Sequence, residues 1–204
     1  MWAIERKYVD PAEVDFGPLP KRHLNKAWFV FTALMWASLA CMATTGLMPL
    51  FLALSFAPIA LIIGRMVAVD VCYLLLLNIY TLPLTLVGIG YSVGLLGRTW
   101  SDALLGLAVG AVIGLVIDLG LHLIRRGQAE LGFGDVKLLA ALGAWVGLTN
   151  LPFALTVAFV ANLLLSLVLP KNSAIPFGFG LGAGIWALSA LELPFMMLLL
   201  RTMS

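Results

Sequence analysis

The sequence predicts an all-α, polytopic transmembrane helical bundle with about seven spans and a cytoplasmic amino terminus. Three observations support this fold class. Hydrophobic residues make up 62% of the 204 residues and charged residues only 11%, whereas soluble domains are roughly 45 to 50% apolar. The apolar residues also form separate runs, most of them close to the ~20 residues that a helix needs to cross a bilayer. Finally, the basic residues gather at alternate ends of these runs.

The chain divides into a short polar segment and a long apolar domain. Residues 1–26 are polar and contain three prolines, so they are predicted to be a cytoplasmic lead-in rather than a cleavable signal peptide, whose apolar core must come early. Residues 27–204 are the expected transmembrane domain. Its predicted spans are 27–45, 50–69, 81–96, 103–124, 136–148, 151–169 and 175–191.

Each span is bounded by turn-forming or charged residues. The fifth run is too short to cross a bilayer comfortably, and the seventh is rich in glycine. In chain order, the residues that separate the runs are Gly46 and Pro49, then Asp70, then Gly97 and Arg98, then Arg125, Arg126 and Gly127, then Thr149, Asn150 and Pro152.

Basic residues favour one orientation of these spans. With the amino terminus in the cytoplasm, ten of the twelve Lys and Arg residues fall on the cytoplasmic side, and only Arg98 and Arg201 fall outside. This asymmetry follows the positive-inside rule. The same orientation puts Asp70 and Asp135 on the cytoplasmic face, so topology alone makes the two carboxylates potential neighbours. Duplicated halves of the kind that many transporters contain are not visible.

Charge and cysteine content exclude several other classes of protein. A formal net charge of +2 is too small to indicate nucleic-acid binding, and the basic residues are better explained as topology signals. Cys41 and Cys72 lie inside apolar runs without a CxxC pair, so neither a thiolate zinc site nor a disulfide framework is expected. We predict no metal and no other cofactor, and the lipid bilayer is the expected environment.

Two carboxylates at the ends of apolar runs are the candidate catalytic residues. An ionised Asp at the bilayer centre costs about 2.5 to 3.5 kcal/mol, so Asp70 and Asp135, retained at a membrane boundary, are functional candidates. Two close Asp side chains cannot readily ionise together, so they could share a proton and activate water. Gly132 and Gly134 permit backbone conformations and close approach, so a substrate strand could lie against this loop.

Three sequence blocks surround these carboxylates. Residues 131–147 read LGFGDVKLLAALGAWVG, Asp70 lies eight residues before Asn78 with Thr81-Leu82-Pro83-Leu84 following, and Ile175-Pro176-Phe177-Gly178 is the third block. Together they resemble the type IV prepilin peptidases, which are intramembrane aspartic proteases of the GxGD type. The first block is similar to that family's second catalytic block almost residue for residue. The resemblance covers about residues 50–191.

The resemblance implies a function and a set of site residues. It implies removal of the short, positively charged leader of type IV prepilins or pseudopilins at the cytoplasmic face of the bacterial inner membrane. The implied catalytic pair is Asp70 and Asp135. The implied loop or substrate-binding residues are Gly132, Gly134, Lys137 and Asn78.

The sequence also departs from the family pattern. Leu77 stands where the family usually has Pro, apolar residues 71–76 replace a charged or polar loop, and Phe179 stands where a Pro usually follows. The cysteine-rich insert that carries N-methylation in bifunctional members is missing. The resemblance therefore implies a peptidase without the methyltransferase, similar to the short members that serve Tad-type pili or specialised secretion systems.

Simpler roles for the acidic residues remain open. Asp135 could only cap the fifth helix, and Asp70 could end a helix or pair with Arg65. Asp118 and His122 lie four residues apart on one helix face and are expected to form a buried, hydrogen-bonded structural pair rather than a proton relay.

Two other functions also remain open. A proton-coupled transporter would retain such acids but should show repeats or broken helices at mid-depth. A non-catalytic pilus or secretion assembly partner would keep the helical bundle without needing two acids. Leu77 and the apolar loop leave this second alternative open.

Overall fold

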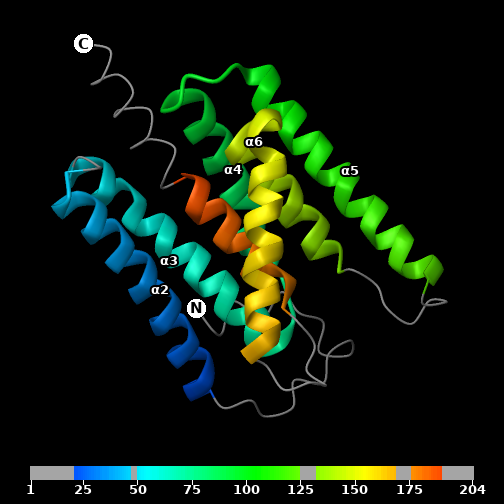
Figure 1. Ribbon diagram of the computed structural model, residues 1–204, viewed down its shortest axis with the longest axis horizontal. Coiled ribbons are helices and arrows are strands. Elements are labelled where there is room, and N and C mark those ends of the chain that lie inside the picture. Colours follow the sequence, from blue (N-terminus) through cyan, green and yellow to red (C-terminus); the bar gives the residue numbers. More distant parts are fainter. Residues whose placement is uncertain (1–20, 47–49, 125–131, 169–175, 190–204) are drawn as a thin grey trace.

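The computed structural model is a bundle of α-helices (Figure 1) and describes residues 21–46, 50–124, 132–168 and 176–189. Residues 1–20 of the predicted lead-in lie outside the described residues. No β-strand occurs in the described ranges, which confirms the predicted all-α class. The helices are α2 (Lys21–Thr44), α3 (Leu50–Tyr73), α4 (Asn78–Gly94), α5 (Trp100–Ile124) and α6 (Phe133–Val168), followed by the short apolar helix Phe177–Ser189.

Several of these helices suit a lipid environment. Four described segments are long and apolar enough to cross a membrane. α4, with 17 residues, and the Phe177–Ser189 helix are apolar but shorter. Large apolar side chains on the outer helices are exposed, as Phe29 (72%) and Leu123 (70%) illustrate; an apolar surface of this kind suits lipid rather than water. The four long segments are Asn25–Thr44, Ala53–Tyr73, Trp100–Leu123 and Phe133–Leu167.

The longest helix, α6, consists of two helices that meet at Gly147. This residue has φ 69° and ψ 172°, a positive φ that glycine adopts without steric cost. Figure 1 shows the chain rising through the first half of α6 and returning through the second. Two separate segments were predicted here, so the division is correct, but it lies at Gly147 rather than between 148 and 151.

Side chains near the start of α5 satisfy the backbone groups that this break leaves without helical partners. Arg98 Nη1 donates a hydrogen bond to the Trp145 carbonyl at 3.1 Å. On the other side of the break, the Leu148 N–H donates to Asp102 Oδ1 at 3.2 Å. Arg98 and Asp102 also form an ion pair, with 3.8 Å between Arg98 Nε and Asp102 Oδ2. A charged pair thus stabilises the point where α6 reverses.

Glycines let α5 pack very closely against the first half of α6. A Cβ added at Gly106 or Gly110 would meet a backbone carbonyl of α6, and one at Gly114 would lie 3.0 Å from Val136 Cα. These glycines recur every four residues, the small-xxx-small spacing that allows membrane helices to approach each other. Because α5 contacts Val136, this packing fixes the position of the first turn of α6, which carries Asp135.

An aromatic cluster connects α3, α4, α6 and the last described helix. The ring centroids of Phe56 and Tyr91 are 5.3 Å apart, those of Tyr91 and Trp145 are 5.0 Å apart, and those of Phe56 and Trp186 are 6.2 Å apart. The Tyr91 hydroxyl also donates to the Ser189 carbonyl at 2.7 Å. Rings at these distances make favourable tilted and edge contacts. The cluster therefore fixes how far the helices slide along one another.

Candidate active site

Asp70 lies in the last turn of α3 and is only 3% exposed. The helix ends at Tyr73 because Leu74 takes a positive φ of 54°. The Leu74 N–H still donates to the Asp70 carbonyl at 2.7 Å. Leu77 is extended, and α4 begins at Asn78. Residues 74–77 therefore form a short connection, here called the α3–α4 connection, beside Asp70.

Asp135 lies in the first turn of α6. Its N–H donates to the Gly132 carbonyl at 2.8 Å, and its carboxylate accepts the Gly132 backbone N–H. An acid at this place reaches back to the residue before the helix, as the acid of a capping box does. Asp135 is thus the third residue of α6 and not its N-cap, so the capping role considered from the sequence is not the one the structure shows. The Asp135 side chain is only partly buried, so this contact does not withdraw it from the surface.

Leu76 of the α3–α4 connection lies beside both segments that position the two acids. A Cβ at Gly134 would lie 2.6 Å from Leu76 Cβ and 2.7 Å from its carbonyl oxygen, and one at Gly178 would lie 2.9 Å from Leu76 Cδ2. The Asp70 and Asp135 carboxylates interact electrostatically. The structure thus brings both predicted acids to one end of the bundle, here called the Asp end.

The start of the Phe177–Ser189 helix is the third part of this site. The Gly178 N–H donates to Asp70 Oδ2 at 2.8 Å, and the Phe179 N–H also donates to this carboxylate. A Cβ at Gly178 would lie 2.9 Å from Asp70 Oδ2. The sequence did not predict that this block bonds to Asp70, because backbone donors depend on where the chain lies and have no side-chain pattern.

Asn78 and Lys137, two of the predicted loop or substrate-binding residues, contact each other. Lys137 Nζ donates to Asn78 Oδ1 at 2.8 Å and lies 5.7 Å from the centre of the Phe133 ring. The bond ties the start of α4 to the first turn of α6. It therefore links α4, the helix that follows Asp70 in the chain, to α6, the helix that contains Asp135.

The two loop glycines play different parts. Neither Gly132 nor Gly134 has a positive φ, so the special backbone conformations considered from the sequence are not used. The close approach occurs at Gly134, and the neighbour is Leu76 of the same chain. A Cβ at Gly132 would lie 3.6 Å from Asp135 Oδ2, an ordinary van der Waals contact.

The apolar stretch after Asp70 has a structural explanation. Val71, Cys72 and Tyr73 complete α3, and Leu75 and Leu76 pack against the hydrophobic core. The segment is therefore a half-buried connection across the end of the bundle, with Leu74 exposed and its other apolar side chains packed against the core.

The structure also tests the pairings considered from the sequence. Arg65 lies 5.6 Å from the centre of the Trp28 ring of α2, and its five-residue offset from Asp70 corresponds to about 140° around a helix. Asp118 Oδ1 is buried and accepts no hydrogen bond, while His122 is exposed. The hydrogen bond expected between Asp118 and His122 is therefore not made by that oxygen.

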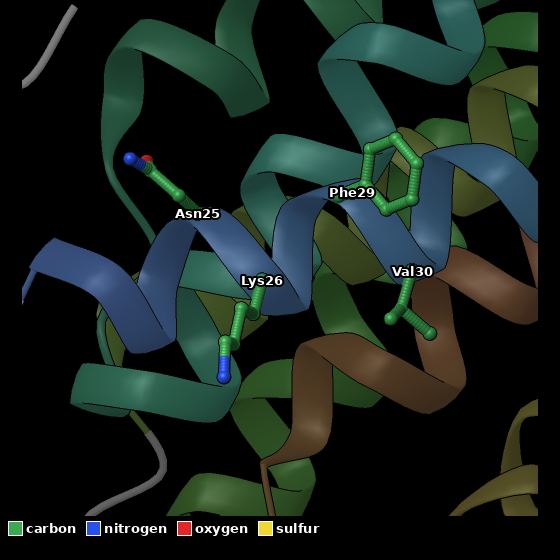
Figure 2. A pocket seen from close by; sticks show the side chains of 4 residues that line it. All are labelled: Asn25, Lys26, Phe29 and Val30. Carbon is green, nitrogen blue, oxygen red and sulfur yellow. The ribbon is translucent and has the colours of Figure 1, made fainter.

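A shallow surface hollow on α2 contains none of the predicted site residues. Its lining residues are Asn25, Lys26, Phe29 and Val30. Figure 2 shows Lys26 and Val30 on one side of the helix and Asn25 and Phe29 on another. Because its described lining residues come from one helix, they do not converge on a common point as the polar groups of binding sites do. The site at Asp70 and Asp135 remains the better candidate.

Comparison with known proteins gives a consistent set of relatives. The sequence model of the type IV leader peptidase family matches residues 55–167. The prepilin leader peptidase/N-methyltransferase of Burkholderia pseudomallei (strain 1026b) is 37% identical over 128 residues, covering 58% of this chain and 41% of that protein. The protein of the same name from Xanthomonas campestris pv. campestris is 39% identical over 127 residues, covering 59% and 44%.

A third relative of that name, from Pectobacterium carotovorum subsp. carotovorum, is 33% identical over 116 residues, covering 55% of this chain and 41% of the relative. The matches thus span less than half the length of these three curated relatives. No solved structure matches. Asp70 and Asp135 both lie inside the segment that the family model covers, and Gly178 lies beyond it.

Proposed function

This chain belongs to the type IV leader peptidase family, and we propose that it is an intramembrane aspartic endopeptidase that removes the leader peptide of type IV prepilins or pseudopilins. One observation supports this proposal above all others. Asp70 and Asp135 come from different helices and both lie near Leu76 at one end of a bundle of apolar helices. A site at the end of the helices gives water access without opening the bilayer core.

The proposed reaction uses the two carboxylates in different states. One, ionised, takes a proton from water while the water oxygen attacks the carbonyl carbon of the scissile peptide. The other, protonated, donates a hydrogen bond to the carbonyl oxygen. The C–N bond then breaks and the departing nitrogen takes up a proton. Because close acids do not readily ionise together, the proton belongs to the pair rather than to either residue.

Backbone donors would hold the pair in this arrangement. The Gly178 N–H donates to Asp70 Oδ2 at 2.8 Å, and the Gly132 N–H donates to the Asp135 carboxylate. Such fixed donors cost little reorganisation when charge moves during the reaction. The two acids are thus oriented by separate parts of the chain, each at the start of a helix.

We further propose seven membrane crossings, a cytoplasmic amino terminus and the bacterial inner membrane as the location. The count of basic residues supports this orientation. Lys137 lies at the Asp end, and Lys26 precedes Phe31, whose ring contacts Phe179 at 5.6 Å. Arg98 lies at the opposite end beside Trp145. The Asp end would then face the cytoplasm.

Cysteine labelling tests this orientation. In a variant whose Cys41 and Cys72 are replaced by Ser, Ser101→Cys at the opposite end should react with a membrane-impermeant maleimide in intact spheroplasts. Asn25→Cys at the Asp end should react only after lysis, since both positions are exposed but lie at different ends. The reverse pattern would overturn the proposed orientation, and equal labelling of both before lysis would overturn the assignment of these two ends to opposite membrane faces.

Cleavage by the purified protein in lipid vesicles tests the function. Added prepilin or pseudopilin should lose its leader, and the mass of the product should correspond to a single cut before the apolar helix of the pilin. A stable complex without cleavage would instead indicate the assembly-partner alternative. Proton movement across the vesicle membrane without any cleavage would indicate the transporter alternative.

A further inference from the structure

The first turn of the Phe177–Ser189 helix is held from two sides. The N–H groups of the first three residues of a helix, here 177–179, have no partner within the helix. Here the Gly178 N–H donates to Asp70 Oδ2 at 2.8 Å, and the Gly180 N–H donates to Asn162 Oδ1 at 3.0 Å. The turn thus connects an acid of α3 with an amide side chain in the second half of α6.

Asn162 holds this turn through both of its polar atoms. In addition to the bond from Gly180, Asn162 Nδ2 lies 3.5 Å from the Phe177 carbonyl oxygen, close enough for a weak hydrogen bond. The side chain therefore bonds to one donor of the turn, the Gly180 N–H, and to one acceptor, the Phe177 carbonyl. It acts on the turn as a cap residue does, although it belongs to another helix. Asn162 is partly buried, so water is a poor substitute for it.

The two helices also approach closely at this point. A Cβ at Gly180 would meet the Ala158 carbonyl and the Asn162 amide, and one at Gly184 would lie 2.8 Å from the Ala154 carbonyl. The backbone of the Phe177–Ser189 helix thus lies directly on the second half of α6. Asn162 marks the end of this contact that is nearest to Asp70.

We propose that Asn162 is a positioning residue for Asp70. Its bond to Gly180 fixes where the first turn of the Phe177–Ser189 helix lies relative to α6. That turn orients the Asp70 carboxylate through the Gly178 N–H. Asn162 itself does not contact the reacting atoms. This inference rests on the proposed peptidase function only in taking leader cleavage as its activity readout.

A purely structural role for Asn162 predicts different results. A hydrogen bond between membrane helices contributes only modestly to stability, so a structural bond would change the amount of folded protein and leave the turnover of the folded fraction unaffected. A positioning role changes kcat, because a displacement of about 1 Å in a catalytic group can cost ~10²-fold.

The kinetic experiment uses two variants of Asn162 and one control. Asn162→Leu keeps the volume and removes both bonds, and it should lower kcat for leader cleavage about 10- to 100-fold with KM changed less than about twofold. Asn162→Asp keeps the acceptor for the Gly180 N–H and should restore most of the lost rate. The control is Ser166→Ala, because within the described residues the Ser166 hydroxyl bonds to the Leu163 carbonyl of its own helix, and it should cleave at the normal rate.

Amide hydrogen exchange of residues 178–180 gives a readout that does not require activity. Exchange should be faster in Asn162→Leu than in the unmodified protein, and Asn162→Asp should restore slow exchange. A normal kcat or unchanged exchange in Asn162→Leu would overturn the inference, and so would failure of Asn162→Asp to restore either. If the unmodified protein does not cleave, the proposed function fails, while the exchange data still decide whether Asn162 holds the turn.

Discussion

Asp135→Asn and Asp70→Asn are each expected to lower leader cleavage by about 10²- to 10⁴-fold, the range that acid–base groups contribute. Asn keeps the size of Asp and most of its hydrogen bonds, so the Gly178 and Gly132 N–H groups retain their acceptors. Only the ability to take or give a proton is lost. Cleavage of a co-expressed prepilin in membranes, followed by gel shift, measures the effect, and the level of membrane-inserted protein should stay normal.

Asp118→Asn is the matched control for these two variants. Asp118 lies in the apolar helix α5, and its buried Oδ1 accepts no hydrogen bond, so amidation removes a costly group from the membrane interior. Cleavage should therefore be preserved. If both the Asp70 and Asp135 variants still process the leader at a near-normal rate, the aspartic mechanism is wrong. If Asp70 alone is dispensable, Asp118 becomes the next candidate for the second acid.

The sequence predicted the helical class and the meeting of the two acids for physical reasons. Long apolar runs have few alternatives to a helical bundle in lipid, because every backbone polar group needs a partner within the chain. The basic residues then placed Asp70 and Asp135 on one side. The reversal inside 133–168 was also visible, because short apolar runs separated by Thr149 and Asn150 indicate a turn.

The backbone contacts of the site could not be predicted in the same way. Gly178 and Phe179 contribute N–H groups, which every residue except proline has, and Asn162 acts from a helix about a hundred residues after Asp70 in sequence. The apolar α3–α4 connection counted against Asp70 in the sequence, because a polar loop was expected there. Leu75 and Leu76 of this connection instead pack against the core. Leu76 also lies next to Gly134 and Gly178.

The tight contact between Leu76 and Gly134 has a measurable consequence. A methyl group at 134 would lie 2.6 Å from Leu76 Cβ and 2.7 Å from its carbonyl oxygen, closer than real side chains approach. The carbonyl belongs to the backbone of a short connection between two packed helices, so it cannot move aside by a rotamer change. Gly134→Ala should therefore push the first turn of α6 away from the α3–α4 connection and separate Asp135 from Asp70.

We expect Gly134→Ala to lower leader cleavage by about 10²-fold, because a catalytic group displaced by about 1 Å loses this much. The protein should still insert, since the close α5–α6 contacts of Gly106 and Gly110 are made with residues 139–147 of α6. Gly120→Ala is the matched control, because a Cβ there meets nothing within 4 Å and alanine favours helix.

Gly132→Ala separates two explanations of the motif, since its Cβ makes only an ordinary contact at 3.6 Å. If Gly132→Ala cleaves well and Gly134→Ala does not, the second glycine serves the meeting of the two acids. If both variants lose cleavage equally, the glycines instead leave room for the substrate backbone, and if Gly134→Ala is fully active, contact with Leu76 does not set the spacing of the pair.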